Sequence, residues 1–235
     1  MQLFYNSTID NSISQFVFPT EESKHIVKVL RKTEGDTLYI TNGKGYIYAA
    51  EVMIADLKKC KVKIISKQKK HKPMHHLHLV VAPTKMNDRF EWFLEKATEI
   101  GVNEITPIIC DHSERKVLKM ERLQKVIQSA MKQSLQAYLP LLNDPISFSD
   151  FMKKEQRELL FIAHCEEEEK AELKRRVAPD KDVTVLIGPE GDFSSTEIKL
   201  AYEKGFIPVS LGKNRLRTET AAIVACTTVA MINNG

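Results

Sequence analysis

The alternation of strand-like and helix-like segments that fills most of the chain restricts its fold more than any other sequence feature. Short apolar runs of strand length recur at 77–82, 105–109, 158–163, 182–187 and 206–211. Segments with helical periodicity lie between them, at 87–100, 119–139, 194–204 and 218–232. Asn87 and Ser194 are the expected helix caps, and Gly101 and Gly205 the expected helix stops. We therefore predict an α/β domain with a mostly parallel sheet over residues 77–235.

The first part of the chain has a different pattern, typical of a small β-barrel. Short strands are expected at 15–18, 37–41, 46–52 and 61–65, with a glycine turn at 42–45. One helix is expected from a cap at Thr20, through His25, to about Arg31. The stretch 67–73 has no apolar residue and ends in proline, as linkers do. The predicted division is a barrel at 1–70, a linker at 71–76 and the α/β domain at 77–235.

Positive charge is concentrated in this first part. Residues 1–75 carry 13 Lys and Arg against 7 Asp and Glu, whereas the remainder carries 22 against 24. Such an asymmetry favours a barrel that meets a polyanion such as RNA. A lysine-rich face that merely contacts solvent explains the charge equally well.

Other residues argue against several classes of protein. The four cysteines stand singly, which is typical of reduced thiols in the cytoplasm and not of a disulfide or zinc framework. The most apolar stretch, 221–232, is too short for a membrane span, and residues 1–5 lack the pattern of a signal peptide. His76 and His78 would share one face of a strand, but no acid or cysteine adjoins them. We therefore expect no membrane segment and no metal.

Three strand ends of the α/β domain carry unusual loops, at 163–165, 188–191 and 211–221. Ligands of open α/β sheets bind at the carboxyl ends of strands, where glycine allows a ligand to approach the backbone. The chain has neither a Gly-x-Gly-x-x-Gly nor a Gly-Lys-Ser/Thr motif, which disfavours a nicotinamide or ATP enzyme. Considered alone, Gly188 and Gly212 could also be ordinary turn glycines.

The order of several short motifs adds a more specific indication. The C-terminal set contains Ile187-Gly-Pro-Glu-Gly-Asp-Phe-Ser194, Glu197, Gly205-Phe206, Leu211-Gly212 and Leu216-Arg-Thr-Glu-Thr-Ala221. Earlier in the chain come His25 with Val29-Leu30-Arg31, Lys96-Ala-Thr-Glu-Ile-Gly-Val102, and Gln133-Ser134 followed by Pro140. Together they resemble the RsmE family, a branch of the SPOUT superfamily, over nearly the whole chain. Asp192 departs from a third glycine in the family's pattern, and Asn214-Arg215 from an arginine followed by an aliphatic residue.

The resemblance implies a PUA-like RNA-binding barrel, a SPOUT α/β domain with a C-terminal trefoil knot, and a homodimer. It also implies S-adenosylmethionine as cofactor and methylation of the N3 position of one uridine in small-subunit ribosomal RNA. The residues expected to bind the cofactor are Ala163, His164, Ile187, Gly188, Pro189, Glu190, Gly191, Leu211, Gly212, Leu216, Arg217, Thr220 and Ala221.

The N3 position of uridine must lose a proton before it can attack a methyl group. A guanidinium suits the resulting anion, which makes Arg217 the candidate catalytic residue. Glu219 is a candidate general base or a residue that orients Arg217. Alternatively, the two form a structural pair at the start of the last helix. The residues expected to contact RNA phosphates are Arg31, Lys61, Lys63, Lys67, Lys69 and Lys70.

Two other functions remain open from the sequence. A non-enzymatic RNA-binding protein would use only the basic barrel and would not bind S-adenosylmethionine. Another knotted methyltransferase would share the cofactor but act on transfer RNA.

Overall fold

The structure is a computed structural model that describes residues 2–10, 12–155, 159–166 and 169–234. It forms two compact units. The first contains the chain up to Lys72 together with Met131–Leu139, and the second contains Pro73–Ala130 and the chain from Pro140 onward. Among the described residues, no helix is both long and apolar enough to cross a membrane.

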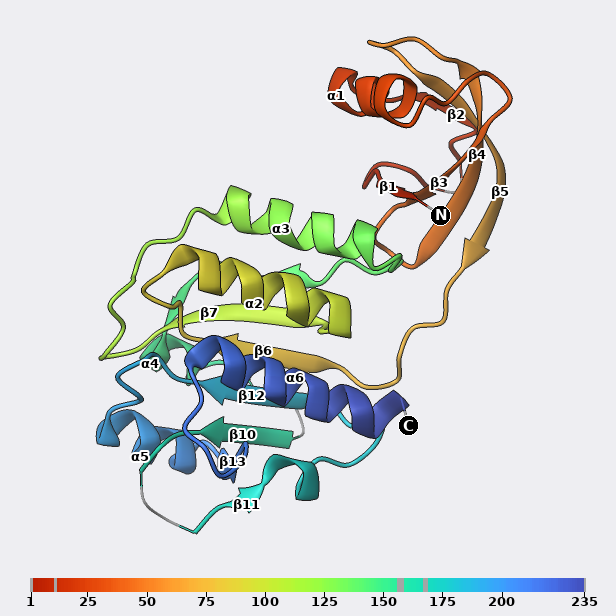
Figure 1. Ribbon diagram of the computed structural model, residues 1–235. Helices are drawn as coiled ribbons and strands as arrows, with labels where there is room; N and C mark the ends of the chain where they lie inside the picture. Colours follow the sequence, from red (N-terminus) through yellow and green to blue (C-terminus); the bar gives the residue numbers. More distant parts are fainter. Residues whose placement is uncertain (1, 11, 156–158, 167–168, 235) are drawn as a thin grey trace. The chain divides into compact units, whose positions relative to one another are not determined.

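The first unit is built on a five-stranded sheet (Figure 1). In spatial order its strands are β1 (Leu3–Tyr5), β3 (Thr37–Thr41), β4 (Tyr46–Ile54), β5 (Lys61–Lys69) and β2 (Gln15–Val17). The two edges of the sheet share one apolar core, because the rings of Phe4 in β1 and Phe18 after β2 lie 5.4 Å apart. The sheet is therefore strongly curled, in keeping with the predicted small barrel.

Two predictions for this unit need correction. β5 does not end at Ile65 but continues to Lys69, because Lys67 pairs with Tyr48 and Lys69 with Tyr46, so the stretch 67–73 is not a linker throughout. Thr20 does not cap the helix. The cap position is Pro19, and the Thr20 hydroxyl donates to the carbonyl of Lys58 at 3.3 Å instead.

The helix of this unit has two parts. An α-helical turn, α1 (Thr20–Lys24), continues as a π-helical turn, η1 (His25–Val29). The helix ends close to the predicted position, where Arg31 adopts a left-handed conformation with φ 53°. This conformation, unfavourable for a residue with a β-carbon, turns the chain away from the helix axis.

The second unit contains the predicted parallel sheet. Its strand order is β11 (Ala171–Glu172), β13 (Ile207–Ser210), β10 (Leu159–Ala163), β12 (Val183–Ile187), β6 (Leu77–Val81), β7 (Glu104–Ile109) and β8 (Leu141–Leu142). A further strand, β9 (Ile146–Ser147), pairs with β7, and all of these pairings are parallel. The predicted start of β10 at Glu158 lies outside the described residues. The continuous burial of β6 and β12 explains why both are uninterrupted apolar runs.

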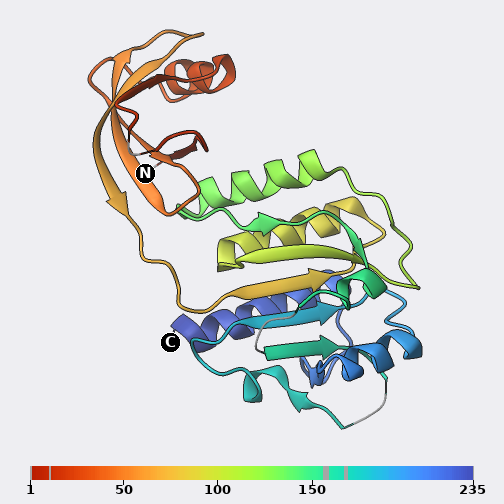
Figure 2. The ribbon, with the colours of Figure 1, turned by 180° about the vertical axis from the view of Figure 1, so that it is seen from behind.

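Helices cover both faces of this sheet, as Figures 1 and 2 show. α2 (Asn87–Ile100) and α6 (Thr218–Asn234) pack together, and α6 also packs on β6 and β12. On the opposite face, α4 (Phe148–Phe151) and α5 (Ser195–Glu203) bury Phe151 and Ile198 against Val80 and Leu186 of the sheet. A 3₁₀ turn, η2 (Leu173–Arg175), contacts α6.

Most helix ends follow the sequence signals. Gly101, with φ 115°, ends α2, and Ser194 forms a capping box with Glu197 at the start of α5. Asn87 is not the cap of α2, however; Met86 occupies that position, without a side-chain hydrogen bond.

The helix predicted at 119–139 is also shorter than expected, since α3 covers Met120–Gln133. Leu135 leaves the helical conformation with φ 59°. The next residues bond to the glycine turn of the first unit instead, because Gly45 N donates to Ala137 O and Leu139 N to Gly43 O, both at 2.9 Å.

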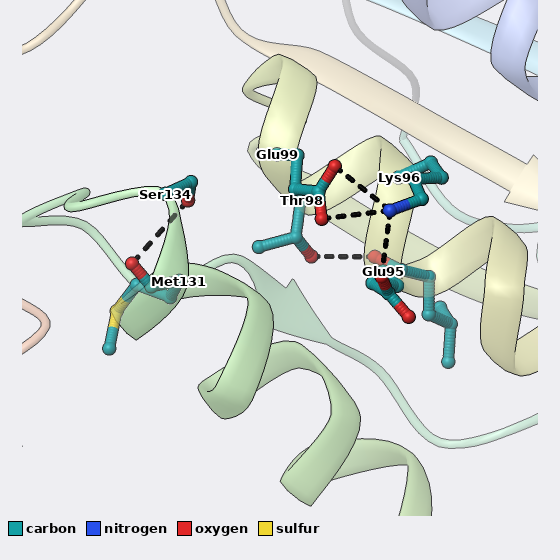
Figure 3. A network of polar contacts seen from close by, with 7 residues as sticks. Glu95, Lys96, Thr98, Glu99, Met131 and Ser134 are labelled. Atoms are coloured by element: carbon teal, nitrogen blue, oxygen red, sulfur yellow. Dashed lines mark hydrogen bonds and ion pairs between the residues drawn. The ribbon is translucent and has the colours of Figure 1, made fainter.

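Two motifs of the family resemblance have local structural roles, shown in Figure 3. In α2, the Lys96 ammonium contacts Glu95 at 2.7 Å and Glu99 at 3.0 Å, which raises the pKa of Lys96, and Thr98 donates to the carbonyl of Leu94. Just after α3, the Ser134 hydroxyl donates to the carbonyl of Met131 at 3.4 Å. Each of these contacts joins residues of one helix or of its end, and it stabilises that helix.

Candidate functional site

A pocket of about 780 Å³ lies in the second unit, at the carboxyl ends of three adjacent strands, β10, β12 and β13. Its size is typical of sites that bind small organic molecules. Most of its lining comes from the three loops singled out in the sequence, the last of which includes the start of α6. The lining residues are Ala163, His164, Cys165, Lys170, Ile187, Gly188, Pro189, Glu190, Asp192, Val209, Ser210, Leu211, Gly212, Lys213, Asn214, Arg215, Leu216, Arg217, Thr218 and Ala221.

The structure brings together all of the predicted cofactor-binding residues except two. Gly191 and Thr220 do not line the pocket. Gly191 instead packs against the β7 loop, where a β-carbon on it would lie 3.0 Å from the β-carbon of His112. Gly191 therefore permits close packing behind the pocket wall, and Thr220 lies within the first turn of α6.

The loop after β12 is fixed at three points. A β-carbon on Gly188 would lie 3.0 Å from the ring of buried Phe193, so this position requires glycine for packing. The Thr218 hydroxyl donates to the carbonyl of Gly188 at 3.0 Å, which attaches α6 to the loop. The Glu190 carboxylate accepts a hydrogen bond of 2.9 Å from the backbone N–H of Lys85, in the loop after β6.

A polar network supports the loop after β10. The ring of His164 is buried and lies 2.8 Å from the Tyr202 hydroxyl through Nε2 and 3.2 Å from the Lys170 ammonium through Nδ1. An ammonium can only donate, so Nδ1 accepts and Nε2 carries the hydrogen. Lys170 also donates to the carbonyls of His164 and Glu166. Both ring nitrogens are thus hydrogen-bonded, and the ring stiffens the pocket wall.

Sequence reasoning missed several pocket residues, above all Asp192 and Cys165. The Asp192 carboxylate accepts a hydrogen bond of 2.7 Å from the backbone N–H of Cys165. Burial raises the pKa of the Cys165 thiol, and the charge of Asp192 adds to this effect. The sequence contained one signal for this contact: Asp192 stands where the family's pattern has a glycine. The substitution puts a carboxylate beside backbone N–H groups.

The two candidate catalytic residues have different surroundings. Arg217 is exposed and lines the pocket, and no salt bridge to it is found in the described part of the chain. Glu219 is buried, is absent from the pocket lining, and lies 3.9 Å from Nε of Arg89 in α2. The structural pair at the start of α6 is therefore Glu219 with Arg89, and Arg217 is left facing the pocket.

The predicted RNA contacts all lie in the first unit but not on a single surface. Lys63 pairs with Glu51 in the sheet, whereas Lys67 pairs with Tyr48, and a bulge at Ile65 separates the two pairings. Glu51 and Tyr48 project from opposite faces of β4, so the bulge places Lys61 and Lys63 on one face and Lys67 and Lys69 on the other. Arg31 and Lys70 are exposed.

The two histidines considered as metal ligands have an acidic neighbour that the sequence did not reveal. Glu104 of β7 lies 3.4 Å from His76 and 3.7 Å from His78. His78 also contacts the Thr106 hydroxyl at 2.7 Å. Across the described residues, no group of three or more potential ligands could hold a metal ion.

Comparisons with known proteins agree with this arrangement. Residues 70–230 match the model of an RNA methyltransferase domain, and residues 18–65 that of an RNA methyltransferase PUA domain. Two relatives named ribosomal RNA small subunit methyltransferase E are similar over most of their length. The protein of Buchnera aphidicola is 32% identical over 93% of this chain and 88% of its own, and that of Rickettsia conorii 30% identical over 99% and 96%.

Solved structures are also similar over the whole chain. A probable rRNA-methyltransferase from Porphyromonas gingivalis has a TM-score of 0.92 and 39% identity, covering 100% of this chain and 99% of its own. A ribosomal RNA small subunit methyltransferase E from Neisseria gonorrhoeae, bound to S-adenosylmethionine, has a TM-score of 0.87 and 25% identity, covering 99% and 98%.

Proposed function

The chain belongs to the ribosomal RNA small subunit methyltransferase E family, and from this premise we propose that it methylates the N3 position of a uridine in small-subunit ribosomal RNA, with S-adenosylmethionine as the methyl donor. The observation that carries the proposal is the position of Arg217. Arg217 lines a pocket formed by three adjacent strand ends, and no salt bridge joins it to a carboxylate among the described residues.

The pocket suits S-adenosylmethionine, which would supply the methyl group on its sulfonium. At the end of β13, nothing except Gly212 itself and its two chain neighbours lies within 4 Å of a β-carbon placed on Gly212, so the space beside this glycine is open to a ligand. Ala163, Ile187 and Leu216 provide apolar walls for a flat ring. Apolar walls with a few polar groups are typical of sites that bind small organic molecules.

Arg217 would stabilise the reacting base. Loss of the N3 proton spreads negative charge over the nitrogen and its two neighbouring carbonyl oxygens. A planar guanidinium can donate two hydrogen bonds to adjacent atoms of such an anion, and its charge lowers the free energy of the deprotonated base. Arg217 is thus proposed to make N3 nucleophilic at neutral pH.

The proton acceptor is better sought at Glu190 than at Glu219. Glu219 is buried against Arg89 and does not line the pocket. Of the carboxylates that do, Asp192 uses both oxygens on backbone N–H groups. Glu190 is exposed and uses Oε1 on Lys85, so its Oε2 remains for the N3 proton. Glu219 would instead position the start of α6 through Arg89.

We also propose a trefoil knot, with the RNA bound through the first unit and a homodimer as the functional state. For the knot, the chain passes from β13, between β11 and β10, into α6, which covers β12 and β6, and the Thr218 hydroxyl donates to Gly188 in the loop after β12. For the dimer, α6 is apolar in composition, and its Met231 is 71% exposed. Sedimentation should give twice the 26.8 kDa of one chain at micromolar concentration. A single-chain mass would contradict the dimer.

Nucleoside analysis tests the reaction itself. Small-subunit and transfer RNA from a strain without the gene would be digested separately and their nucleosides measured by mass. We expect loss of 3-methyluridine from small-subunit RNA only, with recovery when the wild-type gene, but not the Arg217→Ala form, is restored. Loss of a methylated nucleoside from transfer RNA would instead indicate a knotted methyltransferase that acts on transfer RNA. An unchanged nucleoside pattern, with no binding of S-adenosylmethionine, would indicate an RNA-binding protein without activity.

A further inference from the structure

Asp192 occupies a backbone conformation that usually belongs to glycine. Its φ is 64°, in the left-handed region, and its N–H donates to the carbonyl of Pro189 at 2.9 Å, which closes a tight turn. A side chain with a β-carbon makes this conformation less favourable than glycine would. The carboxylate must therefore supply something that a glycine at this position would lack.

Both carboxylate oxygens of Asp192 accept hydrogen bonds from backbone N–H groups. Oδ2 accepts from Cys165, in the loop after β10, at 2.7 Å. Oδ1 accepts from Phe193, in the loop after β12, at 2.9 Å. Hydrogen bonds to a charged acceptor are stronger than those between neutral groups. One side chain thus ties together the two loops that form adjacent walls of the pocket.

A third loop also contacts this turn, through the side chain of a histidine. His112, which follows β7, lies 3.0 Å from the carbonyl of Gly191 and 3.1 Å from that of Asp192 through Nδ1. Carbonyls only accept, so Nδ1 carries the hydrogen and donates to both. The backbone of Asp192 is therefore fixed from one side while its carboxylate reaches Cys165 on the other.

We propose that Asp192 is a positioning residue that sets the separation of the β10 and β12 loops and so prepares the pocket for its ligand. The ligand identity rests on the proposed function. A pocket whose walls are already held in place loses less conformational freedom when the ligand binds, which raises affinity. Asp192 acts through the Cys165 backbone and not on the reacting atoms.

The informative substitution is Asp192→Gly, because glycine accepts the left-handed backbone and only the carboxylate is lost. Asp180→Gly is the matched control. Asp180 has φ 57°, is exposed, and does not line the pocket. Both substitutions remove one negative charge from a left-handed backbone position, so a difference between them reports on the contact with Cys165.

Two measurements test the proposal. Hydrogen exchange of the Cys165 amide, without ligand, should become faster in Asp192→Gly and stay unchanged in Asp180→Gly. Calorimetry should show that Asp192→Gly raises the Kd by similar factors, roughly tenfold, for S-adenosylmethionine and for S-adenosylhomocysteine, whose sulfur carries no charge. The melting temperature should not fall, because relief of the left-handed strain offsets the lost hydrogen bonds.

The outcomes are distinct. Unchanged Cys165 exchange, together with Kd values within twofold of wild type, would overturn the proposal. A loss of affinity confined to S-adenosylmethionine would also overturn it, because the carboxylate would then act by direct attraction to the sulfonium. If the wild type bound neither ligand, the proposed function would fail, while faster Cys165 exchange in Asp192→Gly would still support the coupling of the loops.

Discussion

The hydroxyl of Thr218 donates a buried hydrogen bond of 3.0 Å to the backbone carbonyl of Gly188. It joins the first residue of α6 to the loop after β12, so one bond couples the last helix to the pocket wall. Thr218→Val keeps the shape of the side chain but removes the donor and leaves a buried carbonyl unsatisfied. We expect a loss of about 1–3 kcal/mol in the free energy of unfolding, measured with urea, and weaker ligand binding.

The matched variant for this bond is Thr218→Ser, which keeps the hydroxyl and loses only a methyl group. It should retain most of the ligand affinity. If the valine and serine variants bound S-adenosylmethionine equally well, the hydrogen bond would have no role in holding the pocket.

Gly188 is the position at which a side chain should be tolerated least. Its added β-carbon would meet the ring of Phe193 at 3.0 Å and the Phe193 backbone nitrogen at 3.3 Å. Gly188→Val should therefore displace the loop and abolish detectable binding of S-adenosylmethionine in calorimetry. In Gly188→Ala, a second change of Phe193→Leu should restore part of the affinity by removing the ring atoms. Equal binding by wild type and Gly188→Val would place the ligand elsewhere.

Local patterns predicted most of the architecture. The buried strands β6 and β12 are continuous apolar runs, and the capping box at Ser194 is a signal confined to four residues. The three loops of the pocket followed from the rule that ligands bind beyond the carboxyl ends of parallel strands. Such features depend on residues close in sequence or on a general rule of topology, so a single sequence contains them.

The features that were missed depend on contacts between distant residues. α3 ends early because Ala137 and Leu139 bond to Gly45 and Gly43, and no pattern near residue 133 shows this. The bulge at Ile65, which separates the lysines of β5, depends on pairing with Ala49 and Ala50. Likewise, the partner of Glu219 proved to be Arg89 of another helix and not its neighbour Arg217.

The assignment of the two glutamates can be tested by parallel substitution. Glu190→Gln removes the proposed proton acceptor but keeps an oxygen for Lys85, so kcat should fall roughly a hundredfold or more with little change in melting temperature. Glu219→Gln leaves Arg89 without a full charge partner, so it should lower the melting temperature more than kcat. The opposite pattern would restore Glu219 as the base.

The rate of methyl transfer should depend on both the positive charge and the planar shape of the Arg217 side chain. Arg217→Ala should lower kcat by roughly a hundred- to a thousandfold, as expected for loss of a donor that stabilises the transition state. Arg217→Lys keeps the charge but not the planar pair of donors, so it should recover only part of the rate. RNA affinity, measured by filter binding, should change little in either variant. Full activity of Arg217→Ala would exclude the proposed role.

Cys165 offers a pH-dependent readout of the pocket, because it is exposed while Cys60, Cys110 and Cys226 are buried. Although the residue is exposed, partial desolvation of its sulfur, and then the charge of Asp192, raises the pKa of its thiol above the ordinary value. Less thiolate is present at a given pH, so alkylation of Cys165 should rise with pH later than alkylation of a free cysteine. Asp192→Asn should shift this rise to lower pH, and S-adenosylmethionine should slow alkylation. An unshifted profile would contradict the influence of Asp192.

The lysines of β5 lie on two faces of the sheet. Their substitution, one face at a time, can therefore show which face contacts RNA. Each phosphate contact adds roughly 0.7 to 0.9 to the slope of log affinity against log salt. If Lys67, Lys69 and Lys70 contact phosphates, their joint replacement by Ala should flatten the slope by roughly 2 and leave S-adenosylmethionine affinity unchanged, since the pocket lies in the other unit.

Replacement of Lys61 and Lys63 applies the same test to the opposite face of the sheet. The control matched to the variant of Lys67, Lys69 and Lys70 replaces Lys125, Lys199 and Lys204, exposed lysines of the second unit, and therefore removes the same three charges. A purely long-range effect of charge would weaken binding similarly in the control and in the variant of Lys67, Lys69 and Lys70, because both lose three charges. Direct contact instead predicts a reduced slope only for the face that touches RNA. Full slopes in both β5 variants would show that the basic strand is a solvent-exposed face and would move the RNA contacts to the second unit.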